Sequence, residues 1–214
     1  MSRSGLSGRR AEAARNDEAI LASAREVFVA DPHAPISAVA EHAGVGISSL
    51  YRRYESKEDL LRKLCGDGLA LYIKIARDAV DDEAGDPWET FATFMKRIVA
   101  ADSHALTRNL AGRFTPTPEL GHAASVADDL NQQLVERAHA AGVLRTDVTA
   151  DDLTYIFEQV SSLHGPTPER TGQLRTRFLT LHLDSLRAPG HTPLPGPPPT
   201  ADEQHARWNR SAPE

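Results

Sequence analysis

Side chains that can donate hydrogen bonds to a nucleic-acid duplex gather in one short stretch, at Ser48, Ser49, Tyr51, Arg52 and Arg53. If this stretch is a helix, Leu50 faces inward and the polar side chains face outward. Hydroxyls, a phenol and guanidiniums all donate to phosphate oxygens, and some of them also reach base edges. The residue types and their spacing therefore predict contact with DNA.

Two short helices and a glycine turn would position these residues. Ser37 is placed to cap a first helix that runs to about Ala43, because its hydroxyl can accept unpaired N–H groups of the first turn. The segment Gly44-Val45-Gly46 ends that helix, since glycine tolerates the positive φ of a sharp turn. A second helix follows from Ile47 to about Tyr54, which is the spacing of a helix-turn-helix that enters the major groove. Inward-facing positions are expected at Val39, Ala43, Val45 and Leu50.

The same glycines approximate a dinucleotide-binding fingerprint, Gly44-x-Gly46-x-x-Ser49. The third glycine is missing, however, and the segment follows a helix-like run instead of a strand. We therefore favour the helix-turn-helix over a nucleotide-binding loop.

The order of motifs around this stretch resembles the N-terminal domain of TetR-family transcriptional regulators. Leu50-Tyr51-Arg52-Arg53-Tyr54 is similar to the family's L-Y-x-x-F, and Ser56-Lys57-Glu58-Asp59-Leu60-Leu61 is similar to its S-K loop followed by E-x-L-L. The resemblance covers roughly residues 15 to 64, and it includes a preceding helix with one apolar stripe, formed by Ile20, Ala24, Val27 and Phe28. Two positions differ. Gly46 stands where many members have Ser or Thr, which removes a side-chain cap, and Tyr54 replaces the usual Phe.

The resemblance implies a transcriptional repressor that binds double-stranded operator DNA as a homodimer and is released by a small-molecule effector. It implies neither enzymatic activity nor a cofactor. We expect phosphate contacts from Tyr51, Arg52, Arg53 and Lys57, and base-edge contacts from Ile47, Ser48 and Ser49. Ser37 completes the predicted DNA-binding set.

The charge distribution agrees with a small DNA-binding surface. The chain has a net charge of −6, but residues 1–63 hold ten basic and nine acidic side chains, which leaves −7 for the rest. Residues 1–14 are expected to form a basic flexible arm, in which Arg9 and Arg10, with Arg15 just beyond, add minor-groove or backbone contacts. DNA affinity should therefore depend on a few phosphate contacts and fall as salt rises.

The rest of the chain is predicted to be helical, so the expected fold class is all-α. A helix-turn-helix DNA-binding domain at 15–63 would precede a helical regulatory and dimerisation domain at 64–188, and a Pro-rich disordered tail would occupy 189–214. Helix starts are indicated by Ser56-x-x-Asp59, Asp86-Pro87 and Thr149-x-x-Asp152. A shorter helical segment is expected near residues 103–114.

Apolar positions in the second domain suggest where a ligand and a second subunit would bind. The expected pocket is lined by Tyr72, Phe91, Met95, Phe114, Leu130, Leu134 and Phe157. The last helix has two apolar stripes, and a helix that is apolar on two sides must be covered on two sides. The resemblance implies that the last two helices form the dimer interface, with Val160, Leu163, Leu174, Phe178 and Leu181 as candidates.

Several other classes are less favoured. No apolar run approaches the roughly 18 residues of a membrane span, and the N-terminus lacks the apolar core of a secretory signal, so a cytoplasmic protein without membrane contact is expected. Cys65, the single cysteine, is expected to be a core residue, with a redox role as the alternative.

A helical metal enzyme and a constitutive DNA-binding dimer stay as functional alternatives. The pairs Glu119-x-x-His122 and Glu136-x-x-His139 have the spacing used in di-iron bundles. They lie 17 residues apart on one predicted helix, however, and so roughly 25 Å from each other, which is too far to share a metal. We therefore expect no metal site.

Overall fold

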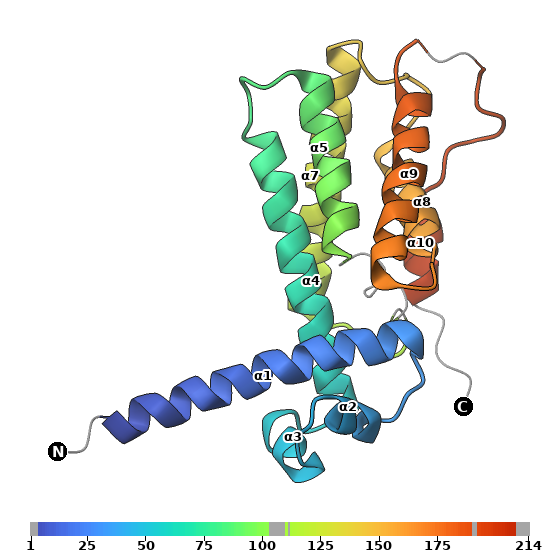
Figure 1. Cartoon of the computed structure of the whole chain (residues 1–214). Coiled ribbons are helices and arrows are strands. Elements are labelled where there is room, and N and C mark those ends of the chain that lie inside the picture. The colour runs from blue at the N-terminus through green and yellow to red at the C-terminus, as the bar shows by residue number, and fades with distance from the viewer. Residues whose placement is uncertain (1–3, 103–109, 111, 190–191, 209–214) are drawn as a thin grey trace.

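The computed structural model describes residues 4–102, 110, 112–189 and 192–208, and Figure 1 gives their arrangement. Over these residues the regular structure is helical, apart from one isolated antiparallel bridge between Leu144 and Arg187. The all-α prediction is therefore confirmed. The described helices include none with the length and apolar character that a membrane crossing requires.

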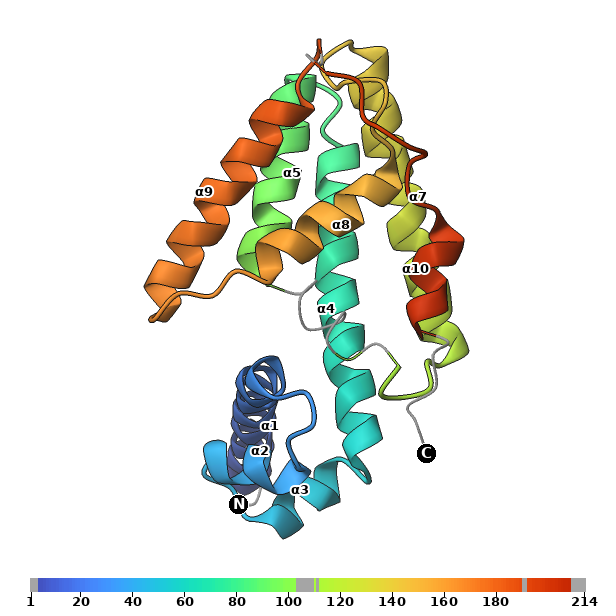
Figure 2. The ribbon, with the colours of Figure 1, turned by 90° about the vertical axis from the view of Figure 1, so that its right-hand side faces the viewer.

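Three helices and the start of a fourth enclose an N-terminal core. They are α1 (Ser4–Ala30), α2 (Ile36–His42), α3 (Ile47–Arg53) and the first turns of α4 (Lys57–Val80). Phe28, Val39 and Leu50 are completely buried where α1, α2 and α3 meet. In Figures 1 and 2 this unit lies below the remaining helices, and α4 leads from it into them.

The beginning of the chain and the start of α2 differ from the predictions. Helix α1 already begins at Ser4, so the prediction of a flexible arm over residues 1–14 is wrong for the described part of that segment. A run rich in Ala, Arg and Glu favours helix, which explains the extension. Ser37 does not cap α2, because extended Pro35 occupies the N-cap position and Ser37 is the second helical residue.

The second part of the molecule is a bundle around a C-terminal core. Helix α4 packs against α5 (Pro87–Ala101) and α7 (Pro118–Ala140), while α8 (Ala150–Ser161) and α9 (Pro168–Leu186) close the other side (Figure 2). The predicted helix starts are confirmed at Ser56, Asp86 and Thr149, each of which accepts hydrogen bonds from the first turn or forms a capping box. Residues 103–109 and 111 of the predicted segment near 103–114 lie outside the described residues.

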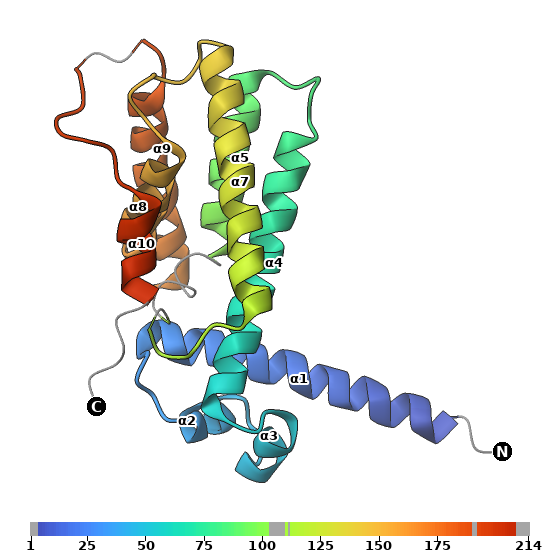
Figure 3. The same cartoon turned by 180° about the vertical axis from the view of Figure 1, so that it is seen from behind.

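The prediction of a disordered tail over residues 189–214 is wrong for one part of the Pro-rich C-terminal segment. Residues 201–208 form a further helix, α10 (Ala201–Trp208), which is drawn in red in Figure 3. Glu203 accepts hydrogen bonds from the backbone N–H and the hydroxyl of Thr200, and the Glu203 N–H donates back to Thr200 Oγ1. This reciprocal cap is a local signal for helix, and it explains why the segment is not irregular from end to end.

Candidate nucleic-acid interface

Helix α3 presents most of the predicted DNA-binding side chains to solvent. Ile47 is 39 % exposed and Tyr51 is 47 % exposed, while Ser48 and Arg52 are exposed beside them. Leu50 is fully buried beneath this face. The structure thus brings Ile47, Ser48, Tyr51 and Arg52 together on one outward surface. Gly46 is the N-cap residue and has no side chain to cap α3, as its type implied.

Arg53 differs from Arg52 because a carboxylate of α1 holds it. Arg53 Nη2 lies 2.7 Å from Asp17 Oδ2, and Arg53 Nε donates to Asp17 Oδ1 at 2.8 Å. The Tyr54 hydroxyl donates to the same Oδ1 at 2.7 Å. The hydrogen bond from Arg53 lowers the pKa of Asp17, and burial together with the bond to Asp17 raises the pKa of Tyr54. Local spacing could not indicate Asp17, which lies 36 residues before Arg53.

The Lys57 ammonium also has partners within the protein. It donates to the carbonyl oxygen of Ala34 at 2.7 Å and lies 5.1 Å from the centre of the Phe28 ring. Burial, as the first cause, lowers the pKa of Lys57. The prediction that this ammonium contacts phosphate does not fit its position, because the side chain is turned toward the loop between α1 and α2.

A short segment from the second half of the chain packs against the N-terminal unit. Leu110 and Phe114 are buried in the N-terminal core, and Arg113 Nη1 donates to His33 Nδ1 at 2.9 Å. The Thr115 N–H donates to Glu58 Oε1, and Arg62 donates to the Thr115 carbonyl. This location corrects the prediction for Phe114, which does not lie with the other expected pocket residues.

The other six expected pocket residues lie together in the C-terminal core: Tyr72, Phe91, Met95, Leu130, Leu134 and Phe157. Each is less than 9 % exposed. Tyr72 meets the rings of Phe94 and Phe157 edge-on, with centroids 6.0 and 6.3 Å away. Its hydroxyl donates to Asn131 Oδ1 at 2.8 Å, and burial raises the pKa of Tyr72. Asn131 is thus a buried polar residue that apolar periodicity could not have identified.

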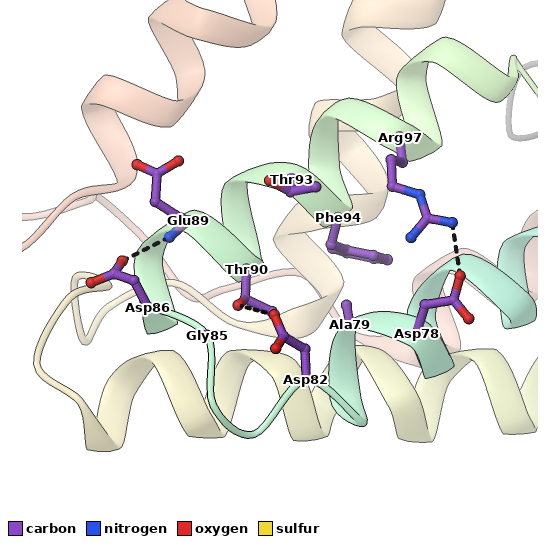
Figure 4. Close-up of a pocket in the computed structure, with 10 residues that line it drawn as sticks. All are labelled: Asp78, Ala79, Asp82, Gly85, Asp86, Glu89, Thr90, Thr93, Phe94 and Arg97. Atoms are coloured by element: carbon purple, nitrogen blue, oxygen red, sulfur yellow. Dashed lines mark hydrogen bonds and ion pairs between the residues drawn. The ribbon is translucent and has the colours of Figure 1, made fainter.

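A polar cavity of about 220 Å³ opens between the end of α4 and the start of α5, and it is not the expected apolar pocket. Figure 4 shows three of its carboxylates, those of Asp78, Asp82 and Asp86, engaged by neighbouring groups. Asp82 accepts from Thr90 Oγ1 at 3.0 Å, Asp78 accepts from Arg97 at 2.8 Å, and Asp86 caps α5. None of the predicted pocket residues lines it. These contacts give the carboxylates a structural role at the junction of the two helices.

The candidate dimer residues occupy two different environments. Phe178 is 41 % exposed and Leu181 is 55 % exposed on the outer side of α9, whereas Leu179 and Leu183 on the opposite side are buried in the C-terminal core. Leu174 and Leu163 are half-buried. Val160 is fully buried in the core of its own protomer, so its assignment to a surface is wrong. The apolar side of α8 that carries Val160 faces the inside of the bundle.

The described residues do not support the two alternatives of a metal site and a redox-active Cys65. No group of three or more His, Cys, Asp or Glu side chains among them is arranged to hold a metal ion. Both carboxylate–histidine pairs lie on α7, and the His139 ring bonds to the carbonyl of Arg145. Cys65 is buried, and burial raises the pKa of its thiol to about 12, which disfavours the reactive thiolate.

Two family models match the chain on the two parts just described. The model for bacterial regulatory proteins of the tetR family matches residues 20–64, which hold α2, α3 and the start of α4. The model for the C-terminal domain of SbtR-like transcriptional regulators matches residues 86–188. The chain belongs to the TetR family. It is therefore a DNA-binding transcriptional regulator and not an enzyme, because members of the TetR family are non-enzymatic transcription factors.

Solved structures of TetR-family proteins have the same fold. A TetR regulator from Mycobacterium vanbaalenii is 25 % identical, with a TM-score of 0.54 over 84 % of this chain and 99 % of that one. LfrR from Mycobacterium smegmatis, solved in complex with proflavine, is 21 % identical, with a TM-score of 0.61 over 85 % and 99 %. The ketosteroid regulator KstR2 of Mycobacterium tuberculosis is 18 % identical, with a TM-score of 0.62 over 81 % and 95 %. No curated protein sequence matches this TetR-family regulator.

Proposed function

We propose that this TetR-family regulator is a repressor that binds a palindromic operator as a homodimer and is released by a small molecule. The observation that carries the proposal is the outward face of α3, where Ile47, Ser48, Tyr51 and Arg52 are exposed above a packed core. A helix of this kind fits the major groove, where Arg52 and Tyr51 would bind phosphate and Ile47 would meet a thymine methyl group.

The outer stripe of α9 supports the homodimer. Phe178 and Leu181 leave an apolar strip exposed on one protomer, and a second copy of the same helix would cover it by two-fold symmetry. Two α3 helices related by that axis would read two half-sites, roughly 34 Å apart in successive major grooves. A palindromic operator follows from this symmetry.

Two connections support regulation by a ligand in the C-terminal core. Helix α4 contributes Leu60, Leu61 and Leu64 to the N-terminal core and Tyr72, Ile75 and Ala76 to the C-terminal core. The segment that holds Leu110 and Phe114 is the second connection. A ligand that moves α4 or this segment would change the separation of the two α3 helices and so lower operator affinity.

The Tyr72–Asn131 hydrogen bond suggests how a ligand would be recognised. A mainly aromatic site with one buried donor–acceptor pair suits a flat, largely apolar molecule that carries a polar group. Proflavine, which is bound in the LfrR structure, is polycyclic, and so are the ketosteroids that appear in the description of KstR2. We therefore propose polycyclic compounds with one or two polar groups as the first ligands to test.

The test begins with selection of bound duplexes from a random DNA pool by the purified full-length protein. We expect a two-fold palindrome, bound by two protomers. A library of polycyclic compounds is then screened for molecules that raise the melting temperature and release the selected DNA. An operator that no compound releases would favour a constitutive DNA-binding dimer, and protein that selects no sequence would contradict the proposal.

A further inference from the structure

The contacts of Asp17 bind the end of α3 to α1. Its Oδ1 accepts hydrogen bonds from Arg53 Nε at 2.8 Å and from the Tyr54 hydroxyl at 2.7 Å, and its Oδ2 forms an ion pair with Arg53 Nη2 at 2.7 Å. The Asp17 side chain is only 18 % exposed. A guanidinium that meets both oxygens of a carboxylate is fixed in orientation as well as in distance, because contact at two points restricts rotation.

Helix α3 depends on contacts of this kind for its orientation. It has seven residues, which is too short for a stable isolated helix, and no side chain caps its N-terminus. Leu50 anchors its middle, and Arg53 with Tyr54 anchors its C-terminal end to Asp17. A binding side chain must be held to within about 0.5 Å of its productive position, so loss of one of two anchors would disturb the exposed face.

We propose that Asp17 is a positioning residue for DNA reading, which sets the angle of α3 through Arg53 and Tyr54 and keeps Arg53 from binding phosphate. Arg52 is exposed, as is Arg53, but among the described residues Arg52 forms no ion pair and donates one hydrogen bond of 3.4 Å to Ser49 Oγ. The two adjacent arginines thus have separate roles, phosphate binding for Arg52 and internal support for Arg53. This inference rests on the proposed operator binding.

The salt dependence of DNA binding distinguishes these roles. Log affinity falls as log salt rises, and the magnitude of this negative slope is the salt slope. Each lost phosphate contact lowers the salt slope by about 0.9, or about 1.8 for a dimer that loses two. We expect Arg52→Gln to lower the slope by this amount. We expect Arg53→Gln to weaken operator binding by about tenfold with an unchanged slope, which corresponds to one lost positioning contact. An equal fall in slope for both variants would overturn the proposal.

Two further variants test Asp17 itself. Asp17→Asn frees Arg53, so the slope should rise and the preference for operator over random duplex should fall by about tenfold, the loss of one coupled contact. Tyr54→Phe removes only a hydroxyl, keeps the buried ring, and should lower the preference less, without a change in slope. Wild-type preference and slope in both variants would contradict the inference.

A measurement without DNA separates this inference from the proposed function. The NMR signal of the Arg53 Nε proton should exchange slowly in the wild-type protein and in Arg52→Gln, and rapidly in Asp17→Asn. Rapid exchange in the wild type would overturn the inference even if an operator is found. If no operator is selected, the salt slopes are measured on random duplex, where Arg52→Gln and Arg53→Gln should still differ.

Discussion

Arg175 Nη1 lies 2.8 Å from Asp102 Oδ2, an ion pair that joins α9 to the end of α5. The same guanidinium donates to the carbonyl oxygens of Ser161 and Leu163, just where α8 ends. Arg175 is only 7 % exposed, and Asp102 has the left-handed φ of 49° that ends α5. One buried cation therefore holds the ends of two helices against a third.

The first prediction concerns the stability that this cation provides. Arg175→Met should lower the free energy of unfolding by about 2–4 kcal/mol, because the carboxylate and the helix-end carbonyls lose their donor, and the partial exposure of Asp102 moderates the cost of a broken buried pair. Urea unfolding measures the change. Arg170→Met, at the exposed start of the same helix, should change it by less than about 0.5 kcal/mol. Equal effects of the two variants would contradict the assigned role.

The second prediction concerns the proposed dimer face. Leu181→Glu should convert the dimer to a folded monomer, because a charge in the centre of an apolar interface would have to be buried without a partner. Sedimentation velocity gives the mass, and circular dichroism verifies the fold. Leu71→Glu is the matched control, since Leu71 is an exposed leucine on α4, away from α9. A Leu181→Glu protein that stays dimeric would place the interface elsewhere.

The sequence predicted the helices well because their signals are local. Asp86-Pro87 and Thr149-x-x-Asp152 are caps that act within one turn, and the structure begins α5 and α8 at both. The two apolar stripes of α9 follow from its own periodicity, and one of them is buried while the other is exposed. The start of α10 had an equally local signal in Thr200-x-x-Glu203, which the Pro-rich composition obscured.

The candidate site was harder to predict because its contacts are long-range. Arg52 and Arg53 are identical in type and adjacent, and only the position of α1 decides that Asp17 meets the second. Phe114 is apolar like the expected pocket residues, but the path of the chain brings it to the N-terminal core. Lys57 carries a charge that suits phosphate, yet the Ala34 carbonyl and the Phe28 ring lie within its reach.

The third prediction concerns stability at high pH. Burial raises the pKa of Tyr72 above its ordinary value of 10.0, so above this pH the unfolded chain loses a proton that the folded protein keeps. The contribution of Tyr72 to stability is therefore complete below pH 10 and is lost as the pH rises further. Tyr72→Phe cannot ionise, and it should be less stable than the wild type at neutral pH by about 1–2 kcal/mol, because Asn131 loses its donor.

Above pH 10, the free energies of unfolding of Tyr72→Phe and of the wild type should approach each other by up to about 1.4 kcal/mol per pH unit. Urea unfolding from about pH 8 to about pH 11 measures this trend. A double variant, Tyr72→Phe with Asn131→Leu, should recover part of the neutral-pH loss, because no buried polar group then lacks a partner. A constant difference across the whole pH range would contradict the buried ionisation.

The last prediction concerns how the C-terminal segment is held. Arg145 forms a bidentate pair with Asp147, at 2.6 and 2.8 Å, and its Nη2 also donates to the Thr192 carbonyl. Asp147 Oδ2 accepts from the Leu194 N–H at 3.0 Å, so both partners bind the backbone that leads to α10. These bonds lower the pKa of Asp147, with Arg145 as the first cause. Arg145 and Asp147 therefore hold the segment at two backbone groups, the carbonyl of Thr192 and the N–H of Leu194.

Arg145→Ala removes one of these points directly and leaves Asp147 without its cation. We expect an endopeptidase that cleaves after proline to cut this variant between Thr192 and Thr200 faster than the wild type, because a protease needs locally released backbone and this stretch has proline at every second or adjacent position. Asp147→Asn keeps an oxygen acceptor for the Leu194 N–H but loses the charge, so cleavage should be intermediate. Thr146→Ala, an exposed residue between the two, is the control. Equal cleavage of all four proteins would mean that α10, and not the Arg145–Asp147 pair, holds the segment in place.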